Sequence, residues 1–96
     1  MPYTYILECA DGSYYVGSTR GDIDVRLAQH NGGSGSAYTA RRLPVKLVWT
    51  AHFERVTEAF AYEKQIQNWS RAKRRALIDG RYDLLPELSR SKSAPR

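Results

Sequence analysis

The chain has 96 residues, one cysteine and a formal net charge of +5, from 15 Lys and Arg against 10 Asp and Glu. This length suits one domain with one modest core, and a hydrophobic content of 42% is too high for a disordered chain. No apolar run approaches the roughly 20 residues that cross a bilayer, and no secretory signal is visible. The lone Cys9 excludes an intramolecular disulfide and a Cys-rich zinc site. We therefore expect a cytoplasmic protein that has no membrane association.

The positive charge has two interpretations that composition alone leaves open. Small basic domains often bind nucleic acid, because neutralising phosphates releases counterions. An excess of Lys and Arg also keeps a domain soluble without any ligand. The choice between them depends on where the charges lie in the folded chain.

The first eighteen residues predict a β-hairpin, with strands at 3–9 and 13–18 joined by a turn at 10–12. The Asp-Gly turn fits either a two-residue loop or a three-residue loop with Gly12 in the left-handed conformation. The three-residue loop puts Tyr5 and Tyr15 on one face of the sheet, and the two-residue loop puts them on opposite faces.

A short helix should follow, capped by Asp22 and ending near 31–33. Residues 32–40 read as a flexible loop interrupted by Tyr38, because Gly and Ser dominate them. Alternating apolar residues then predict a strand over 45–53.

Two further helices complete the predicted order β-β-α-β-α-α, an α+β fold with helices packed on a small sheet. Thr57 is expected to cap a helix that ends near Trp69, and Ser70 a helix over 71–79. The single domain should span residues 1–88, with a short helical turn within 81–88. Residues 89–96 should form a disordered basic tail.

The helix that follows Thr57 has an apolar stripe, and Glu63 lies on or beside it. The stripe consists of Ala59, Tyr62, Ile66 and Trp69. A carboxylate there needs a partner, because burying an uncompensated charge is costly. A divalent cation such as Mg²⁺ or Mn²⁺ would supply one. A salt bridge to an Arg, or exposure at the edge of the stripe, would also resolve the problem, and spacing alone favours these.

Polar residues with chemical potential occur in the hairpin and the first helix. Arg26 and His30 are four residues apart and project from one helix face. Arg suits phosphate and His suits proton transfer, although a solvated helix face explains the pair more simply. Four of the seven tyrosines lie in the hairpin. A tyrosine hydroxyl can bind water or phosphate, and nearby cations can lower its pKa so that it acts as a base.

Basic residues cluster in two places that suit contact with a phosphate backbone. One cluster surrounds the loop after Tyr38, a residue that could stack on a base, and the other fills the last helix. A solvated amphipathic helix explains the second cluster equally well. The candidate nucleic-acid-binding residues are Tyr38, Arg41, Arg42, Lys46, Arg71, Lys73, Arg74 and Arg75.

Several of these motifs together resemble the GIY-YIG nuclease superfamily, in particular its small stand-alone bacterial branch, which is related to the N-terminal nuclease domain of the excision-repair endonuclease. Tyr3-Thr4-Tyr5 followed by Tyr15-Val16-Gly17 resembles the paired signature, with Tyr-Thr-Tyr in place of Gly-Ile-Tyr. Residues 26–31 resemble the helix that carries Arg and His, and Glu63 matches the metal-binding Glu. The stretches 36–45 and 69–73 resemble the small branch.

The resemblance implies a three-stranded antiparallel sheet flanked by helices and a metal-dependent endonuclease that acts on DNA or RNA, structure-selective or repair-related. Glu63 would hold one Mg²⁺ or Mn²⁺, Arg26 would stabilise the phosphate and Tyr15 would position or deprotonate water. Tyr5 and His30 would hydrogen-bond water, phosphate or each other, which requires the three-residue hairpin loop. A protein partner could supply specificity. The alternative is a non-catalytic nucleic-acid-binding module that keeps the fold.

Two departures from the family pattern affect the expected site. Tyr3 stands where the family has a small residue and should narrow the site. The segment 19–21 is one residue longer than usual before the helix, which could displace Arg26 by up to a few Å. Because a loop insertion costs little free energy, we expect the helix to keep its docking.

Overall fold

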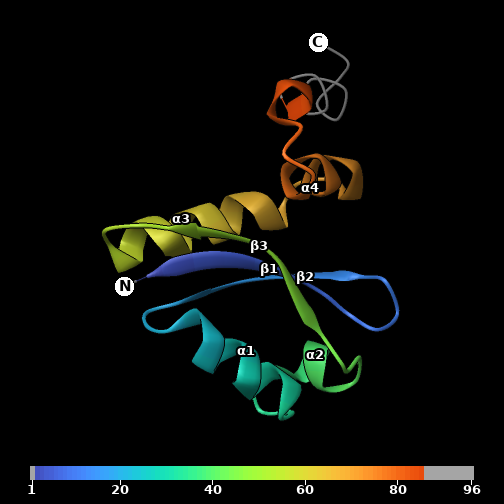
Figure 1. Ribbon diagram of the computed structural model, residues 1–96. Coiled ribbons are helices and arrows are strands. Elements are labelled where there is room, and N and C mark those ends of the chain that lie inside the picture. Colours follow the sequence, from blue (N-terminus) through green and yellow to red (C-terminus); the bar gives the residue numbers. More distant parts are fainter. Residues whose placement is uncertain (1, 86–96) are drawn as a thin grey trace.

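A three-stranded antiparallel sheet with strand order β2-β1-β3 forms the centre of the molecule (Figure 1). The computed structural model describes residues 2–85. The strands are β1 (Tyr3–Glu8), β2 (Tyr14–Thr19) and β3 (Lys46–His52). The helices are α1 (Ile23–Asn31), α2 (Ala37–Ala40), α3 (Val56–Gln67) and α4 (Arg71–Ile78), followed by a 3₁₀ turn, η1 (Tyr82–Leu84). The predicted α+β class and its three-stranded antiparallel sheet are confirmed.

The hairpin between β1 and β2 has the three-residue loop, in which Gly12 takes a positive φ of 85°. The amide of Cys9 donates to the carbonyl of Ser13 at 2.8 Å and closes the loop. The register then pairs Leu7 with Tyr15 and Tyr5 with Gly17. Because residues two apart on a strand share a face, Tyr5 and Tyr15 point to the same side of the sheet, as the family pattern requires.

Helices cover both faces of the sheet, and Figure 1 shows α3 and α4 on one side and α1 and α2 on the other. The α3 side holds a core built on Ile6, Val16 and Ile66. The α1 side holds a second core of Tyr5, Leu7, Cys9 and Val45. The central strand β1 is therefore buried on both faces, which explains its nearly continuous apolar sequence.

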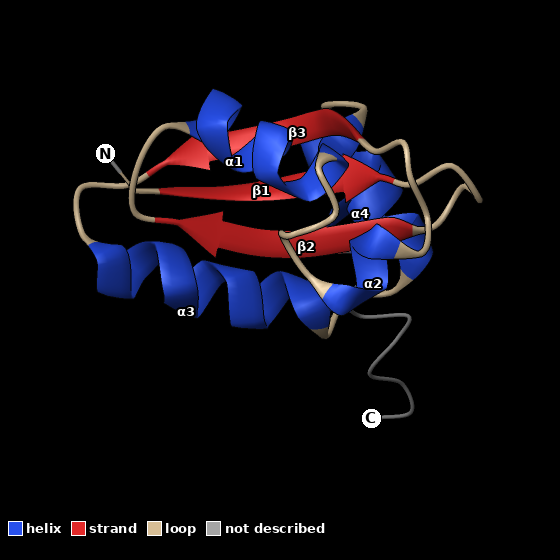
Figure 2. Cartoon of the chain, turned by 90° about the horizontal axis from the view of Figure 1, so that it is seen from below, coloured by secondary structure: helices blue, strands red, loops and turns tan. Residues whose placement is uncertain are grey.

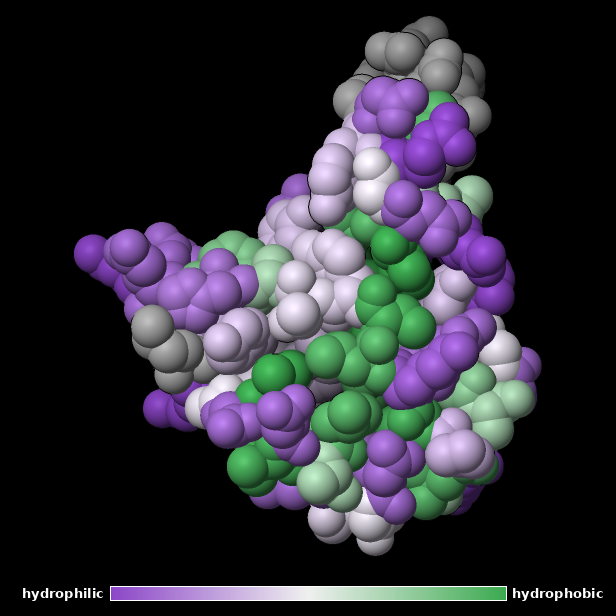
Figure 3. Space-filling view, viewed as in Figure 1, coloured by the Kyte–Doolittle hydropathy of each residue, from purple (hydrophilic) through white to green (hydrophobic). Residues whose placement is uncertain are grey.

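Apolar side chains gather across the middle of the molecule between α1 and α4, and polar side chains cover the projecting ends (Figure 3). Cys9 is buried, as expected of a small core residue, and burial raises the pKa of its thiol. Among residues 2–85, no helix has the length and apolar character needed to cross a membrane.

Helix α2 is the main difference from the sequence prediction, which treated residues 32–40 as a flexible loop. The Ser36 hydroxyl caps this single turn by accepting from the Thr39 amide at 3.1 Å. Thr39 is fully buried and contacts His30. This contact with α1 therefore orders a segment whose Gly- and Ser-rich composition favours a loop.

The predicted helix ends are correct where a side chain caps them. Asp22 accepts from two backbone amides at the start of α1, and Ser70 accepts from the Lys73 amide at the start of α4. The expectation that Thr57 caps α3 was wrong, since α3 begins at Val56 and its N-cap position, Arg55, makes no side-chain capping bond. The predicted tail, 89–96, lies outside the described residues.

Replacement of Ile66 by Ala should destabilise the fold by about 2–5 kcal/mol, because the side chain is fully buried between α3 and the sheet. Urea unfolding followed by circular dichroism would measure the loss. The exposed neighbour Gln65→Ala is the matched control and should leave stability within about 0.5 kcal/mol. A loss below about 1 kcal/mol for Ile66→Ala would contradict this account of the core.

Candidate active site

The hydroxyl of Tyr5 lies at the centre of a buried hydrogen-bond network on the α1 side of the sheet. It lies 2.9 Å from Nε2 of His30 and accepts from Nε of Arg26 at 3.2 Å. Both partners come from α1, where the four-residue spacing places them on one helix face. That face packs on the sheet, so the simpler expectation of a solvated Arg-His pair was wrong.

The extra residue before α1 does not prevent this docking, since Arg26 reaches the sheet and is held there by three bonds. Besides the contact with Tyr5, its guanidinium donates to Gln29 Oε1 at 3.0 Å and to the Gly35 carbonyl at 3.2 Å. These bonds use three of about five N–H donors. The remaining donors can bind an anion while the side chain keeps its position.

Hydrogen-bond satisfaction assigns the tautomer of His30. Arg26 can only donate, so the Tyr5 oxygen accepts that bond and the Tyr5 proton goes to Nε2 of His30. Nδ1 then carries the ring proton and donates to the Thr39 hydroxyl at 2.9 Å. The Thr39 hydroxyl can in turn donate a hydrogen bond to the hydroxyl or to the carbonyl oxygen of Ser36. Every buried polar atom of the network is thereby paired.

The network is uncharged at neutral pH apart from Arg26. Burial, aided by the positive charge of Arg26, lowers the pKa of His30 to about 4. Burial also raises the pKa of Tyr5, although the Arg26 bond opposes that shift. A neutral imidazole accepts the Tyr5 proton without adding a second positive charge beside Arg26.

Tyr15 lies at the open side of this network and belongs to a row of stacked side chains. Its ring centroid is 5.2 Å from that of His30 and 6.0 Å from that of Tyr38, with which it stacks. The Arg42 guanidinium lies 3.8 Å over the Tyr38 ring and also pairs with Asp11 at 3.0 Å. The half-buried Tyr15 makes no side-chain hydrogen bond within residues 2–85, so its hydroxyl can bind water or phosphate.

Two glycines are required because the aromatic rings approach the backbone closely. A Cβ on Gly17 would lie 2.6 Å from the Tyr5 hydroxyl and 3.0 Å from the Tyr15 ring. A Cβ on Gly35 would collide with the His30 ring. The sequence pattern did not indicate Gly35, Ser36 or Thr39, because their contacts with one another and with His30 lie in a segment whose Gly- and Ser-rich composition predicts a flexible loop.

Glu63 lies on the other side of β2, on the helix α3 that runs alongside that strand (Figure 2). Its Oε1 accepts from the Ser18 hydroxyl at 2.6 Å, and its Oε2 accepts from Nε2 of Gln67 at 2.8 Å. The half-buried carboxylate makes no ion pair within residues 2–85. The salt bridge that spacing favoured is therefore absent from that part of the chain, and two neutral donors hold the charge in place.

This carboxylate fits a hard divalent cation, because its oxygens and those of water are the ligands that Mg²⁺ and Mn²⁺ prefer. Within residues 2–85, no group of three His, Cys, Asp or Glu side chains could hold a metal ion. The donor set therefore suits Mg²⁺, which retains several water ligands and needs one or two carboxylates. It does not suit a fully protein-ligated ion such as structural zinc.

The predicted phosphate-contacting residues before and within β3 lie at the surface, but two have acidic partners. Arg42 pairs with Asp11, and Lys46 lies 3.5 Å from Glu8. Arg41 is exposed. Tyr38, 38% exposed, carries Arg42 over its ring.

The basic residues of α4 make structural contacts that the sequence did not indicate. Arg71 lies over the Tyr14 ring at 4.4 Å, and Lys73 is buried over the Trp69 ring at 4.0 Å. Arg74 donates to the carbonyls at the end of α3, those of Ile66 and Gln67, and Arg75 binds Asp79 and the Tyr14 hydroxyl. These contacts fix the corner between α3 and α4, and phosphate binding by these four residues stays a prediction.

Comparison with known proteins identifies the family of the chain. The GIY-YIG catalytic domain family matches residues 1–76. A UPF0213 protein of Halobacterium salinarum is 44% identical over 78 residues, which are 81% of this chain and 100% of that protein. A UPF0213 protein of Halalkalibacterium halodurans is 41% identical over 90 residues, 91% of this chain and 95% of its own length.

A solved structure supports the same relationship. The solution NMR structure of UPF0213 protein BH0048 from Bacillus halodurans, which has the same BH0048 designation as the Halalkalibacterium halodurans relative above, is 42% identical in sequence and has a TM-score of 0.53. The match covers 82% of this chain and 84% of that one. The chain therefore belongs to the GIY-YIG family, whose domain is a nuclease fold, and its relatives are UPF0213 proteins.

Proposed function

We propose that this chain is a metal-dependent endonuclease that hydrolyses phosphodiester bonds of DNA or RNA. The observation that carries the proposal is that Tyr15, Arg26 and Glu63 lie beside the edge strand β2, the first two on the α1 side of the sheet and Glu63 on the α3 side. A cationic donor flanks this strand together with a phenol and a carboxylate that, among residues 2–85, have no side-chain hydrogen bond and no cationic partner respectively. Metal-assisted phosphodiester hydrolysis can use each of these groups, whereas phosphate binding alone needs no carboxylate.

Glu63 would hold one Mg²⁺ or Mn²⁺, which supplies positive charge for the phosphate and lowers the pKa of bound water. Arg26 would bind a phosphate oxygen through the N–H groups that its contacts with Gln29, Gly35 and Tyr5 do not use. Because those contacts fix the guanidinium beforehand, little reorganisation is needed when negative charge develops. Tyr5 and His30 are positioning residues in this scheme.

Tyr15 would position the attacking water or accept its proton. Its ring is held between His30 and Tyr38, so the hydroxyl has a defined place at the site. Contacts with phosphates do not read sequence, so substrate choice would rest on nucleic-acid shape, as in a structure-selective or repair enzyme, or on a protein partner.

Replacement of Glu63 by Gln should abolish cleavage, with a loss of about a hundredfold or more, because a neutral amide is a poor ligand for Mg²⁺. Nicked, branched, flapped and single-stranded substrates would be incubated with Mg²⁺, with Mn²⁺ and with chelator. Glu58→Gln removes an exposed carboxylate from the same helix and should retain activity. Cleavage that persists in Glu63→Gln would contradict the metal assignment, and salt-sensitive binding without cleavage by the unaltered protein would favour a binding module.

Replacement of Tyr15 by Phe should lower kcat by about 10²-fold or more and leave KM nearly unchanged. The variant keeps the ring stacked between His30 and Tyr38 and removes only the hydroxyl. Steady-state kinetics on the substrate that is cut best would measure both constants. A rise in KM at constant kcat would instead assign Tyr15 to substrate binding.

The His30 ring should titrate near pH 4 in the folded protein, well below its usual 6.5, because burial and Arg26 disfavour the charged form. The unfolded chain takes up this proton first as the pH falls. The contribution of His30 to stability is thus present above pH 6.5 and is lost between 6.5 and about 4. NMR titration of a His52→Gln variant, in which His30 is the remaining histidine, would measure the midpoint, and a midpoint near 6.5 would contradict the buried network.

A further inference from the structure

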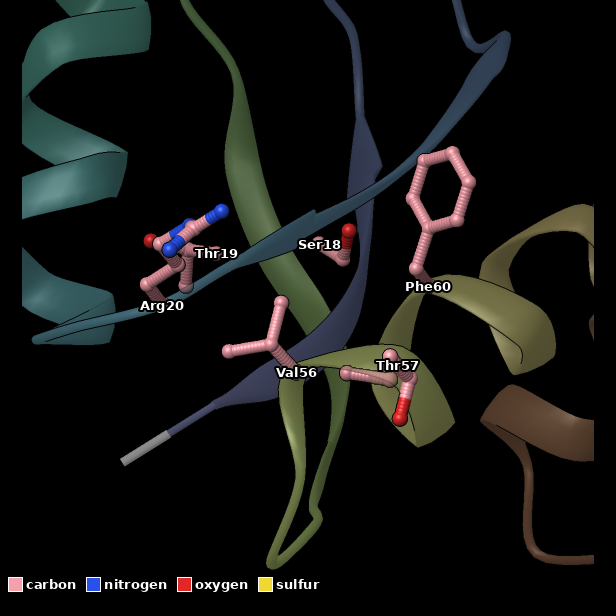
Figure 4. Close-up of a pocket in the computed structure, with 7 residues that line it drawn as sticks. Ser18, Thr19, Arg20, Val56, Thr57 and Phe60 are labelled. Carbon is pink, nitrogen blue, oxygen red and sulfur yellow. The ribbon is translucent and has the colours of Figure 1, made fainter.

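A cavity of about 390 Å³ opens beside the candidate metal ligand, between the end of β2 and the first turns of α3. In Figure 4, the lining residues Ser18 and Val56 lie between Arg20 on one side and Phe60 on the other. The hydroxyl of Ser18 both lines this cavity and donates to Glu63. The cavity therefore adjoins the carboxylate that would hold the metal.

The wall of the cavity contains an aromatic ring that the core does not use. The Phe60 side chain is 51% exposed, although a phenyl ring normally gains free energy by burial. Val56, also on α3, is 39% exposed on the same wall. Together they offer an apolar, partly aromatic surface at the edge of the candidate active site.

Two cations border the cavity, and the Glu63 carboxylate lies beside it through its bond with Ser18. Arg20 lines it, and the Lys64 ammonium group lies 4.7 Å over the Phe60 ring. None of the described residues that line the cavity is acidic. An apolar ring flanked by cations suits a ligand that has a flat aromatic part and a negatively charged part.

We propose that this cavity binds an unstacked nucleobase of the nucleic-acid strand, next to the phosphate that is cut, with the base stacked on Phe60 and a neighbouring phosphate bound by Arg20. The inference rests on the proposed nuclease function, because it takes the position of the cut from Glu63. A cavity of this volume lies within the range of small-molecule sites. A base inside a regular duplex is covered by its neighbours, so the cavity selects strands that are single-stranded or locally opened.

Binding would be measured in chelator, so that no turnover occurs, with a short single-stranded oligonucleotide that carries one 2-aminopurine. Stacking on Phe60 should change the fluorescence of the probe, and Phe60→Ala should weaken binding about 5- to 100-fold and remove the change. Phe60→Trp should retain both. The control Tyr82→Ala removes another exposed aromatic residue outside the cavity and should bind like the unaltered protein.

A second pair of variants tests the phosphate contact. Arg20→Gln should reduce the slope of log K against log salt concentration by about 0.7, the loss expected for one phosphate of a single strand. Arg81→Gln removes the same charge from an exposed site outside the cavity and should change this slope less.

Equal binding of the single-stranded probe by Phe60→Ala and by the unaltered protein would overturn the inference. The inference would also fail if the duplex form of the probe bound as tightly as the single strand and its binding did not depend on Phe60. The binding result is separable from the proposed activity. Phe60-dependent stacking without cleavage of any substrate would leave the cavity standing and remove the nuclease assignment. Cleavage that requires Glu63 but not Phe60, together with binding that does not depend on Phe60, would support the nuclease assignment and overturn the cavity proposal.

Discussion

The fully buried hydroxyl of Tyr5 is the constraint on which the candidate site depends. A buried hydroxyl without a partner costs about 1–3 kcal/mol, so the surrounding elements must supply both a donor and an acceptor. Arg26 and His30 do so from α1, and Thr39 in turn satisfies His30 from α2. One network therefore joins β1, α1 and α2, and α2 has no apolar core of its own that would otherwise order it.

The same network determines where charge is available. His30 is neutral at pH 7, and Arg26 is held by neutral acceptors, so its positive charge is not cancelled. Glu63, across β2, is likewise held by the neutral donors Ser18 and Gln67. Two opposite charges fixed by neutral partners, on either side of one edge strand, can each bind a ligand of opposite sign. A direct Arg26–Glu63 salt bridge would have used up both charges.

Local patterns in the sequence predicted the features that depend on local geometry. The Asp-Gly turn and the family's need for Tyr5 and Tyr15 on one face gave the hairpin register, and the spacing of Arg26 and His30 gave their shared direction. Of the two partners of Glu63, Gln67 is four residues along the same helix, whereas Ser18 is 45 residues distant and no local pattern indicates it. The contact that orders α2 joins His30 and Thr39, and composition did not indicate it because the segment between them is rich in Gly and Ser.

The net charge of +5 also has a different meaning once the partners are known. Pairing with Asp11, Glu8 and Asp79 offsets the charges of Arg42, Lys46 and Arg75, whereas Arg71 is exposed and packs on an aromatic ring, which leaves it positive. On the proposed function, exposed cations such as Arg71 would attract a polyanion and contact its phosphates without reading sequence. Discrimination between nucleic acids must then come from a feature that responds to the bases or to strand geometry. Beside Glu63, the cavity that Phe60 lines has that capacity, because only an unstacked base can enter it.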